Sequence, residues 1–506
     1  MNTSFNFKDL FIFEMANNHQ GQLEHGKKII QDLGKVAKEN GIRAAVKFQF
    51  RQMDTFIHPD HKKNSANKHI PRFLSTRLTK ENYADLIKEV KKAGLVTMCT
   101  PFDEESVDMI AELGIEVIKI GSCSAKDWPL IEKIADANKP VIFSTGGLAL
   151  KDIDDVVSFF DHRRVHFAIM HCIAVYPTPN EQLQLNQIDT LKRRYRDKVI
   201  GFSSHESPDS LEPVMIAVAK GAKILERHVG VETGDIKLNA YSGTPKQIDT
   251  WVKAALRAKA IAGPEERPVS SDVELEALAS LQRGIFAKTD LKAGAKLERK
   301  DVYFAMPWQK GQLDAGKWKE GMTLKAAVKK DGPVNDNGVE FEENQERKIL
   351  YRAIHEIKGM LNEARIALAV DFQLEFSHHY GVKDFRKTGT TIINCVNREY
   401  AKKILVMLPG QSHPAHFHKK KEETFQVLHG VLDVNIDGRP RSLYPGDILL
   451  VGQGVWHSFS SKDGAIFEEI SSTHFNDDSY YEDKAINSIE RSQRKTTVKN
   501  WGRYQI

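Results

Sequence analysis

Short apolar runs alternate with amphipathic segments along the first 262 residues of the chain. The runs are six or seven residues long and end in turn or polar residues, a pattern that favours buried strands. The segments between them have helical periodicity, and one of these, KENYADLIKEVKKAG, ends at Gly94, a suitable helix C-cap. Eight strands are predicted, at residues 11–16, 44–49, 96–101, 117–122, 141–146, 166–172, 199–205 and 223–229.

Eight strands separated by helices in about 250 residues predict a (β/α)8 TIM barrel over residues 1–265. The alternative that the same pattern allows is an open, doubly wound sheet. The count of strands and the length of the segment favour the barrel.

The rest of the chain has a different pattern. A linker rich in proline, serine and charge covers 262–272, and a small unit of short strands and turns follows at 273–335. A second polar stretch, 335–347, leads into a helix and then into strand-rich sequence with glycine turns. The segment 345–506 is therefore predicted to be a helix plus a compact all-β barrel or sandwich. We expect the polar tail from Asp477 to be loosely packed.

Composition limits the function classes. The 506 residues are 41% hydrophobic and 28% charged, as in soluble globular proteins. The net charge of +5 gives no global field for nucleic acid. The four cysteines form no CxxC pair, and no apolar run approaches the roughly 18 residues of a membrane span. With no signal peptide in view, we expect a cytoplasmic protein that binds neither membrane nor nucleic acid.

Polar residues cluster at the carboxyl end of nearly every predicted strand. In a (β/α)8 barrel these ends meet at one mouth, where the chemistry of this fold takes place. A purely structural role would not favour one end of every strand. The residues are Glu14, Lys47, Gln49, Thr100, Lys119, Ser122, Ser144, Thr145, His171, Ser203, His205, Glu226 and His228.

Three kinds of chemistry follow from these residue types. Two lysines with several hydroxyls and the STGG turn could hold a phosphate. His205 and His228, which end adjacent strands, could bind a divalent metal through neutral imidazoles. Glu14 is placed for proton transfer. Taken singly, each of these residue types is more often a core or solvated residue, and only their convergence at one mouth indicates chemistry.

The motifs FEMANNHQG, KFQ, TPFD, KIGS, STGG, HCIAVYPTP, GFSSH and ERHV occur in an order and spacing that resemble the sialic acid synthase (nonulosonate synthase) family. The resemblance covers residues 11–335. It includes the small unit, which resembles the antifreeze-like SAF domain, a β-clip, that these synthases carry behind the barrel.

The resemblance implies an enzyme that condenses phosphoenolpyruvate (PEP) with an open-chain amino sugar. It implies a manganese, magnesium or other divalent ion on His205 and His228, with Glu14 beside the acceptor sugar. It also implies a homodimer in which each SAF domain caps the barrel of the partner. The implied PEP-binding residues are Lys47, Gln49, Thr100, Lys119, Ser122, Ser144 and Ser203.

Several positions depart from the family pattern. Ala174 stands where such synthases have Asn, Ser204 replaces the Asp of SDH, and GDIKLNAYSGTP replaces the usual acidic loop after ERHV. Met306 occupies the position of the SAF arginine, for which Lys310 could substitute. The residues implied to bind PEP are retained, whereas those implied to bind the acceptor sugar are altered. We therefore expect an acceptor other than N-acetylmannosamine. The alternative is a carbohydrate-binding or regulatory protein on a degenerate synthase scaffold.

A second motif lies in the C-terminal segment. The spacing Gly-x5-His-x-His-x4-Glu-x6-Gly is met from Gly410 to Gly430, and a second, less regular segment contains His457. The first segment matches the first cupin motif without deviation, and the second matches the second cupin motif with Gly452 for Pro and Ser461 for Asn. H-x-H on a strand turns two imidazoles to one face. The predicted ligands are His416, His418, Glu423 and His457, which suit manganese, iron, nickel or zinc.

The alternative for this segment is a metal-free cupin kept for binding or dimerisation. Its surroundings resemble cupin-type sugar isomerases of the lyxose isomerase kind, which implies isomerisation or epimerisation of the acceptor sugar. A carbohydrate sensor and an oxygenase remain alternatives. We expect the run KKKEE (419–423) to be a solvated turn beside the metal site.

Overall fold

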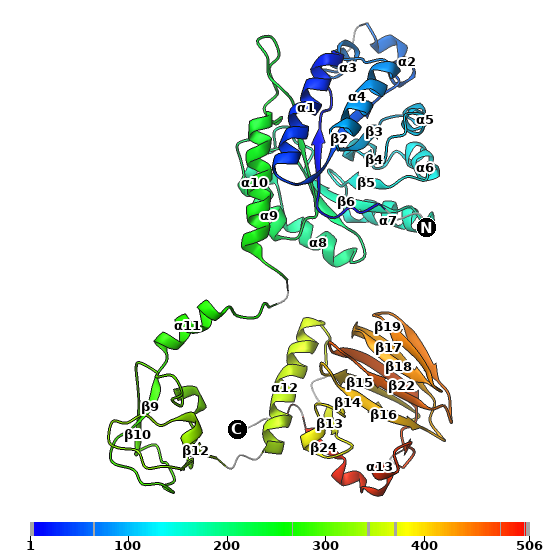
Figure 1. Cartoon of the computed structure of the whole chain (residues 1–506). Coiled ribbons are helices and arrows are strands. Elements are labelled where there is room, and N and C mark those ends of the chain that lie inside the picture. The colour runs from blue at the N-terminus through cyan, green and yellow to red at the C-terminus, as the bar shows by residue number, and fades with distance from the viewer. Residues whose placement is uncertain are drawn as a thin grey trace. The chain divides into compact units, whose positions relative to one another are not determined.

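The computed structural model describes residues 5–63, 66–265, 267–341, 345–368, 372–475, 477–499 and 501. It divides the chain into two compact units, Met1–Val269 and Ser270–Ile506, which are described separately (Figure 1). Glu266 of the predicted linker and residues 342–344 of the second polar stretch lie outside the described residues.

Eight parallel strands close into a barrel in sequential order in the first unit. Closure excludes the open sheet and confirms the (β/α)8 barrel, and every observed strand lies within two residues of its predicted bounds. The strands are β1 (Leu10–Glu14), β2 (Arg43–Phe50), β3 (Val96–Pro101), β4 (Val117–Ile120), β5 (Val141–Ser144), β6 (Phe167–Cys172), β7 (Ile200–Ser204) and β8 (Ile224–His228).

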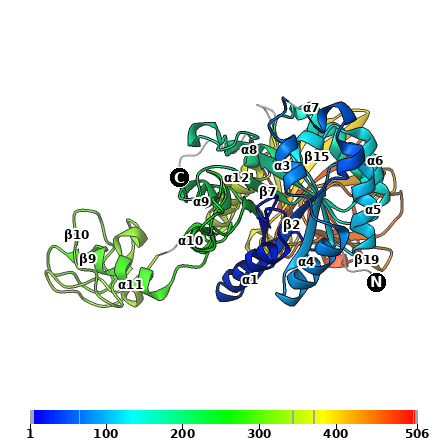
Figure 2. The ribbon, with the colours of Figure 1, turned by 90° about the horizontal axis from the view of Figure 1, so that it is seen from above.

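Helices surround these strands, and α4, α5 and α6 are seen outside them in Figures 1 and 2. Local signals set their ends: Asp103 caps α5 by accepting from Ser106 N at 2.8 Å, and Thr79 forms a capping box with Asn82 on α4. The helices are α1 (Leu23–Glu39), α2 (Met53–Phe56), α3 (Ile70–Ser75), α4 (Lys80–Lys92), α5 (Glu104–Glu112), α6 (Trp128–Asp136), α7 (Leu150–His162), α8 (Asn186–Arg194), α9 (Glu212–Ala219) and α10 (Pro245–Ala262).

The barrel interior is apolar at one end and polar at the other. Side chains alternate along a strand, so Leu10, Ile12 and Glu14 share one face of β1. Ile12 belongs to a buried cluster that fills the amino-terminal end of the barrel, while Glu14 begins the polar layer at the carboxyl end. The same change recurs on β8, from Ile224 to Glu226. The core thus ends where the polar side chains begin, and it holds them in a buried layer.

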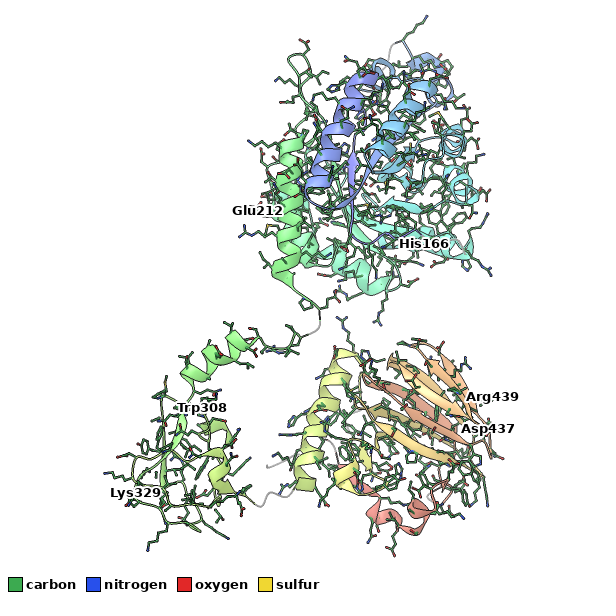
Figure 3. All side chains as sticks on the ribbon, viewed as in Figure 1. His166, Glu212, Trp308, Lys329, Asp437 and Arg439 are labelled. Atoms are coloured by element: carbon green, nitrogen blue, oxygen red, sulfur yellow. The ribbon has the colours of Figure 1, made fainter. Side chains whose placement is uncertain are left out.

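The second unit begins with α11 (Asp272–Leu281) and a small region with its own core, in which Ile285, Leu297 and Val334 are fully buried. Its strands are β9 (Gly284–Ala287), β10 (Val302–Ala305), β11 (Thr323–Leu324) and β12 (Val339–Glu340). Trp308, labelled in Figure 3, donates from Nε1 to the carbonyl oxygen of Gln312 at 2.6 Å. These contacts stabilise a region too short to form a large core.

The C-terminal region consists of two antiparallel sheets preceded by α12 (Gln345–Glu363). The apolar face of α12, with Ile354 and Ile357, packs on one sheet, and a second cluster around Phe425 and Phe459 is the other core of this region. The first sheet is β20 (Ile448–Val451), β17 (Glu423–Gly430), β22 (Ala465–Ser472), β15 (Tyr400–Met407), β14 (Thr390–Asn397), β13 (Gln373–Ser377) and β24 (Lys495–Lys499). The second is β19 (Arg439–Leu443), β18 (Leu432–Ile436), β21 (His457–Ser460), β16 (Ser412–Phe417) and β23 (Tyr480–Tyr481).

Two features complete this region. Asp437 and Arg439 are labelled in Figure 3: Asp437 lies in the turn between β18 and β19, and Arg439 begins β19. Asp437 Oδ1 accepts from Trp456 N at 3.0 Å. The prediction of a loosely packed tail from Asp477 is wrong. The tail contributes β23, α13 (Lys484–Ser488) and β24, which pairs with β13, and Asp478 is buried.

In the described part of the chain, no helix combines the length and the apolar character that crossing a membrane requires.

Candidate active site and candidate metal centre

A buried ion cluster lies at the mouth of the barrel. Lys47 on β2 forms ion pairs with Glu14 on β1 and with Glu226 on β8, the second at 2.8 Å. Lys119 on β4 lies 3.7 Å from Glu226 Oε2. All four side chains are at most 5% exposed, so their charges interact with little screening by water.

The two carboxyl groups of this cluster differ in acidity. Burial raises the pKa of Glu226, but Lys119 and Lys47 outweigh it and lower that pKa to about 2. Burial raises the pKa of Glu14 above its usual value, even though Lys47 opposes the shift. Glu226 therefore keeps its charge, and Glu14 is the carboxyl that takes up a proton more readily.

Hydroxyl groups surround the second lysine. Lys119 Nζ donates to Ser144 Oγ at 2.5 Å, and Ser203 Oγ donates to Glu226 Oε1 at 3.2 Å. Ser122 Oγ accepts from Gly146 N at 3.0 Å. Thr100 Oγ1 is buried and has no hydrogen-bond partner within the described residues. These groups form a cradle of donors of the kind that binds an anion.

Two imidazoles lie together at the same mouth. The ring centroids of His205, just after β7, and His228, the last residue of β8, are 5.3 Å apart. Burial lowers the pKa of His205 to about 4 and that of His228 well below its usual value, so both are neutral at pH 7. The rings of Tyr176 and Tyr241 pack against them, at 4.3 Å from His205 and 5.1 Å from His228.

The structure brings together most of the predicted barrel residues, but His171 is an exception. His171 faces away from the mouth, because side chains alternate on β6, and its Nε2 contacts the Leu183 carbonyl oxygen at 2.7 Å. Gln49 lies two residues after Lys47 on the same face of β2, and its Oε1 accepts from Arg51 at 3.0 Å. Ser204, at a departure from the family pattern, donates to the Glu226 carbonyl oxygen.

Sequence reasoning missed two features of the mouth. Glu226 was identified only as a polar strand end, although it is the counter-charge of both lysines. Tyr241 lies in the segment that departs from the family pattern, and no local signal marks it as a neighbour of the imidazoles.

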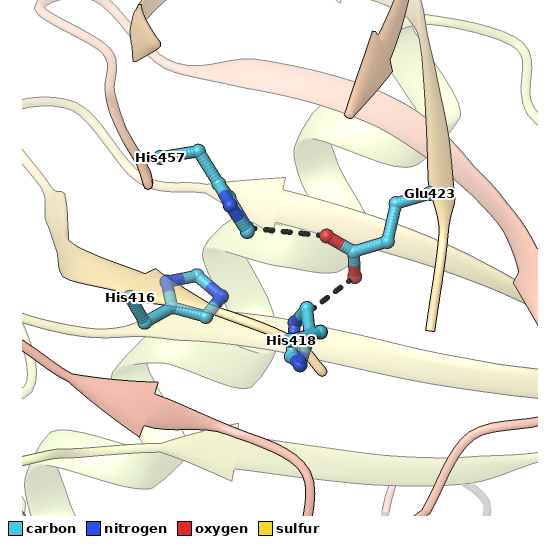
Figure 4. Close-up of side chains that lie close together, drawn as sticks. All are labelled: His416, His418, Glu423 and His457. Atoms are coloured by element: carbon cyan, nitrogen blue, oxygen red, sulfur yellow. Dashed lines mark ion pairs between the residues drawn. The ribbon is translucent and has the colours of Figure 1, made fainter. Parts of the chain in front are cut away.

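The four predicted cupin ligands converge in the C-terminal region (Figure 4). Each of His416, His418, Glu423 and His457 is buried and offers a ligand atom within 4.8 Å of the others. His418 Nε2 lies 3.4 Å from Glu423 Oε1, and His457 Nε2 lies 3.1 Å from Glu423 Oε2. The H-x-H pair on and just after β16 thus meets ligands from β17 and β21.

Backbone carbonyls orient the three imidazoles. The Nδ1 atoms of His416, His418 and His457 contact the carbonyl oxygens of Pro414, Asp478 and Val455 at 3.0, 2.5 and 3.0 Å. A carbonyl only accepts, so each Nδ1 carries the proton and each Nε2 presents a lone pair. Such Nδ1–H contacts with backbone carbonyls are typical of metal-ligating histidines.

The lone pairs of this site face one another. In the described part of the chain, His418 Nε2, His457 Nε2 and Glu423 Oε2 are buried without a hydrogen-bond partner. Because His457 Nε2 carries no proton, it and Glu423 Oε2 are two hydrogen-bond acceptors only 3.1 Å apart, and they repel each other. A cation between them would turn this repulsion into ligation, so the residues fit a divalent metal.

A buried charge network adjoins the metal centre. Lys421 forms ion pairs with Glu423 and, at 3.1 Å, with Glu469, which also pairs with Lys403 at 2.8 Å. A cavity of about 40 Å³, measured as the space that the centre of a water molecule can occupy, lies here. It is lined by these residues and by His416 and His418. The prediction that KKKEE is a solvated turn is wrong for Lys421, which is 3% exposed.

Asp478 completes the loop that carries the ligands. Its carboxylate accepts from the backbone N–H groups of Lys419, Lys420 and Lys421 at 2.9–3.1 Å. Its own carbonyl contacts His418 Nδ1, so one tail residue supports both the loop and a candidate ligand. It lies 60 residues from His418, too far for the motif to indicate it.

These features define a class: a (β/α)8 barrel with a lysine and imidazole mouth, joined to a cupin-type centre. A family model described as the NeuB family matches residues 33–267, and a cupin domain model matches 403–468. The chain belongs to the NeuB family and carries a C-terminal cupin domain.

Several relatives match more than half of the chain. An uncharacterized protein of Methanocaldococcus jannaschii is 30% identical over 58% of this chain and 84% of its own length. The N,N'-diacetyllegionaminic acid synthase of Campylobacter jejuni is 28% identical over 57% of this chain and 87% of its own length. A Chromobacterium violaceum crystal structure, assigned to spore coat polysaccharide biosynthesis protein E, has 46% identity and a TM-score of 0.64, covering 66% of this chain and 100% of that one.

Proposed function

We propose that the barrel catalyses a PEP-dependent, aldol-type condensation with an open-chain sugar, giving a nonulosonic or related 3-deoxy-2-keto sugar acid and phosphate. Relatives named as N,N'-diacetyllegionaminic acid synthase and pseudaminic acid synthase support this reaction class. The substrates are PEP and a sugar aldehyde.

One observation carries the proposal: two buried lysines and a cluster of hydroxyls share a mouth with two neutral imidazoles. Lys47 and Lys119 would hold the phosphate and carboxylate of PEP, together with Thr100, Ser122, Ser144 and Ser203. Thr100 Oγ1, buried without a partner among the described residues, is a donor that this ligand would satisfy.

The imidazole pair fits a divalent cation. His205 Nδ1 contacts the Ile173 carbonyl oxygen at 3.1 Å, which leaves the lone pair on Nε2. Among the described residues no third histidine, cysteine, aspartate or glutamate completes a group of ligands there, so water and substrate would fill the remaining positions. Such a cation would act as a Lewis acid on the aldehyde oxygen.

The chain's own groups account for the other steps. PEP carbon 3 attacks the aldehyde carbon, and water adds at PEP carbon 2, so that phosphate leaves and a 2-keto acid forms. Lys47 and Lys119 stabilise the negative charge through these steps. Glu14, whose pKa burial raises, would give a proton to the new hydroxyl oxygen, while Glu226 stays ionised.

The test is phosphate release from PEP across a panel of aldoses and 2-acetamido sugars. We propose an acceptor other than N-acetylmannosamine, because Ala174 and the loop around Tyr241 depart from the family pattern. Ordinary turnover with N-acetylmannosamine, and with nothing better, would contradict that part. If no sugar of the panel supports phosphate release from PEP, the carbohydrate-binding alternative on a degenerate scaffold is favoured.

For the cupin we propose a metal-dependent isomerase or epimerase that acts on the acceptor sugar. The four convergent ligands and the adjoining Lys421–Glu469 network support a site that polarises sugar oxygens and moves protons. The test uses the full chain with Lys119→Met, metal and candidate aldoses, followed by NMR. We expect isomerisation of at least one aldose, and we expect His418→Ala to abolish it. If no aldose is isomerised with any metal, the proposal is contradicted.

For the small unit we propose an SAF domain that caps the barrel of a partner in a homodimer. Met306, which is 55% exposed, stands at the position of the SAF arginine and carries no charge. The contact that this arginine makes with the active site of the partner would therefore be made by Lys310. Sedimentation velocity tests the dimer. Loss of PEP turnover in Lys310→Ala, with the dimer intact, tests the substitution, and unchanged turnover would contradict it.

A further inference from the structure

Glu206 and Arg227 form an ion pair beside the two imidazoles of the barrel. Arg227 Nη2 lies 2.9 Å from Glu206 Oε1, and both side chains are 0% exposed. Each partner is the chain neighbour of one imidazole: Glu206 follows His205, and Arg227 precedes His228. A change in this pair therefore reaches both imidazoles through one peptide unit each.

The β-ladder does not itself hold the two histidines together. The pairing of β7 with β8 ends at Ser204 and Arg227, one residue before His205. Beyond that point the guanidinium of Arg227 holds the two segments together. Its Nη2 also donates to the carbonyl oxygens of Glu206 at 3.1 Å and Ser207 at 2.8 Å. One side chain of β8 thus fixes the segment that carries His205.

The pair does not line the mouth. Side chains alternate on β8, so Glu226 and His228 face the mouth and Arg227 faces the opposite way. Its guanidinium carbon lies 5.7 Å from the centroid of the Trp251 ring on α10. Glu206 and Arg227 are therefore placed to position other groups and not to touch substrate.

Stability alone does not account for the pair. In the described part of the chain, Glu206 Oε2 and Arg227 Nε and Nη1 are buried without hydrogen-bond partners, which is costly. Both side chains are fully buried, so each charge has lost its hydration and depends on the other. Apolar residues of the same volume often match or exceed the stability of such a pair.

We propose that the Glu206–Arg227 ion pair positions His205 relative to His228 and so sets the affinity of the barrel for a divalent cation. This inference rests on the proposed function, in which the two imidazoles hold that cation. It adds a pair of positioning residues that share no contact with PEP or the sugar.

The test measures Mn²⁺ binding by electron paramagnetic resonance of the full chain. His416→Ala and His418→Ala form the parent background, so that the barrel is the site observed. Glu206→Gln, Arg227→Lys and the double variant Glu206→Gln/Arg227→Met are compared with this parent, and the thermal midpoint of each is recorded. The control is Asp154→Asn/Arg194→Met, which removes a half-exposed ion pair on the outer surface of the barrel.

We expect each single variant to bind Mn²⁺ about 10–100-fold more weakly than the parent, as is typical when a group that orients a metal ligand is lost. The double variant is neutral, so it regains thermal stability, but its Mn²⁺ affinity stays low. The control leaves the affinity unchanged. A double variant that binds Mn²⁺ as tightly as the parent would overturn the positioning role. A parent that binds no Mn²⁺ would instead overturn the cation site of the proposed function.

Discussion

The Nζ atom of Lys47 lies 2.8 Å from Oε1 of Glu226, which ties β2 to β8 across the intervening β1. Glu226 Oε2 is also 3.7 Å from Lys119, so one carboxylate contacts both lysines of the candidate anion cradle. This single negative charge offsets only part of the charge of the two lysines, and an incoming anion competes with Glu226 for the same ammonium groups.

Replacing this carboxylate tests the balance. Glu226→Gln leaves the buried ammonium groups short of negative charge, and we expect about 3–5 kcal/mol less free energy of unfolding. Inorganic phosphate should restore more stability to the variant than to the wild-type protein, because it replaces the lost charge. Urea midpoints with and without phosphate measure both effects. An equal phosphate effect in the two proteins contradicts the shared-cradle account.

Removing a lysine tests PEP binding. Lys119→Met deletes an ammonium from the cradle, and we expect PEP-dependent phosphate release to fall by about 10²–10³-fold. The matched control is Lys139→Met, since Lys139 donates to the Ile115 carbonyl oxygen at 2.7 Å just before β5, at the opposite end of the barrel. Equal losses in both variants would point to a general structural effect.

Replacing Gly146, in the turn that follows β5, tests whether Ser122 contacts PEP. A Cβ at this position would lie 2.7 Å from Ser122 Oγ and 3.2 Å from the Ala174 side chain. Gly146→Ala should displace Ser122 and raise the KM for PEP about tenfold or more. Gly234→Ala is the control, because a Cβ there meets no atom within 4 Å. An unchanged KM in Gly146→Ala argues against Ser122 as a PEP contact.

The cupin centre makes a direct prediction about metal content. His418→Ala removes a ligand whose Nδ1 is already held by the Asp478 carbonyl, and we expect elemental analysis to show loss of the metal bound at the cupin centre, while any metal on His205 and His228 of the barrel is retained. His429→Ala is the control, since His429 lies on β17 outside the ligand group. Metal retained by His418→Ala at the wild-type level is inconsistent with the assigned ligands.

His19 gives a pH-dependent stability. Its pKa is lowered from 6.5 to about 4, chiefly by burial and then by His25 and Arg72. The unfolded chain takes up the proton first, so stability falls as pH drops from 6.5 and the loss is complete near pH 4. His19→Asn should reduce this loss by on the order of 3 kcal/mol between the two limits. Urea titrations at pH 4.5 and 7 measure it, and parallel curves for the two proteins contradict the shift.

Much of the barrel could be predicted because its signals are local. The alternation of apolar strands and helices gave all eight strands, and the carboxyl ends of parallel strands must meet, so Lys47 and Lys119 could be placed at one mouth. The cupin ligands were equally accessible, because the spacing of His416, His418 and Glu423 follows from strand geometry.

The remaining contacts depend on distant parts of the chain. Asp478 supports the loop after His418 from the tail, and Lys421 is buried because Glu469 on β22 pairs with it. No periodicity or motif spans such separations, so the sequence predicts a loosely packed tail and a solvated turn at KKKEE. Likewise, Arg227 reads as one more residue of a strand until Glu206 is seen opposite it.

The most direct test of the account follows carbon from PEP. Full-length protein with a divalent metal, PEP labelled with ¹³C at carbon 3, and a panel of open-chain sugars is examined by NMR. The account predicts that, with at least one sugar, the vinyl carbon signal is replaced by a methylene signal coupled to a sugar carbinol, with equimolar phosphate. Labelled PEP that stays unchanged with every sugar, or yields only pyruvate, would contradict it.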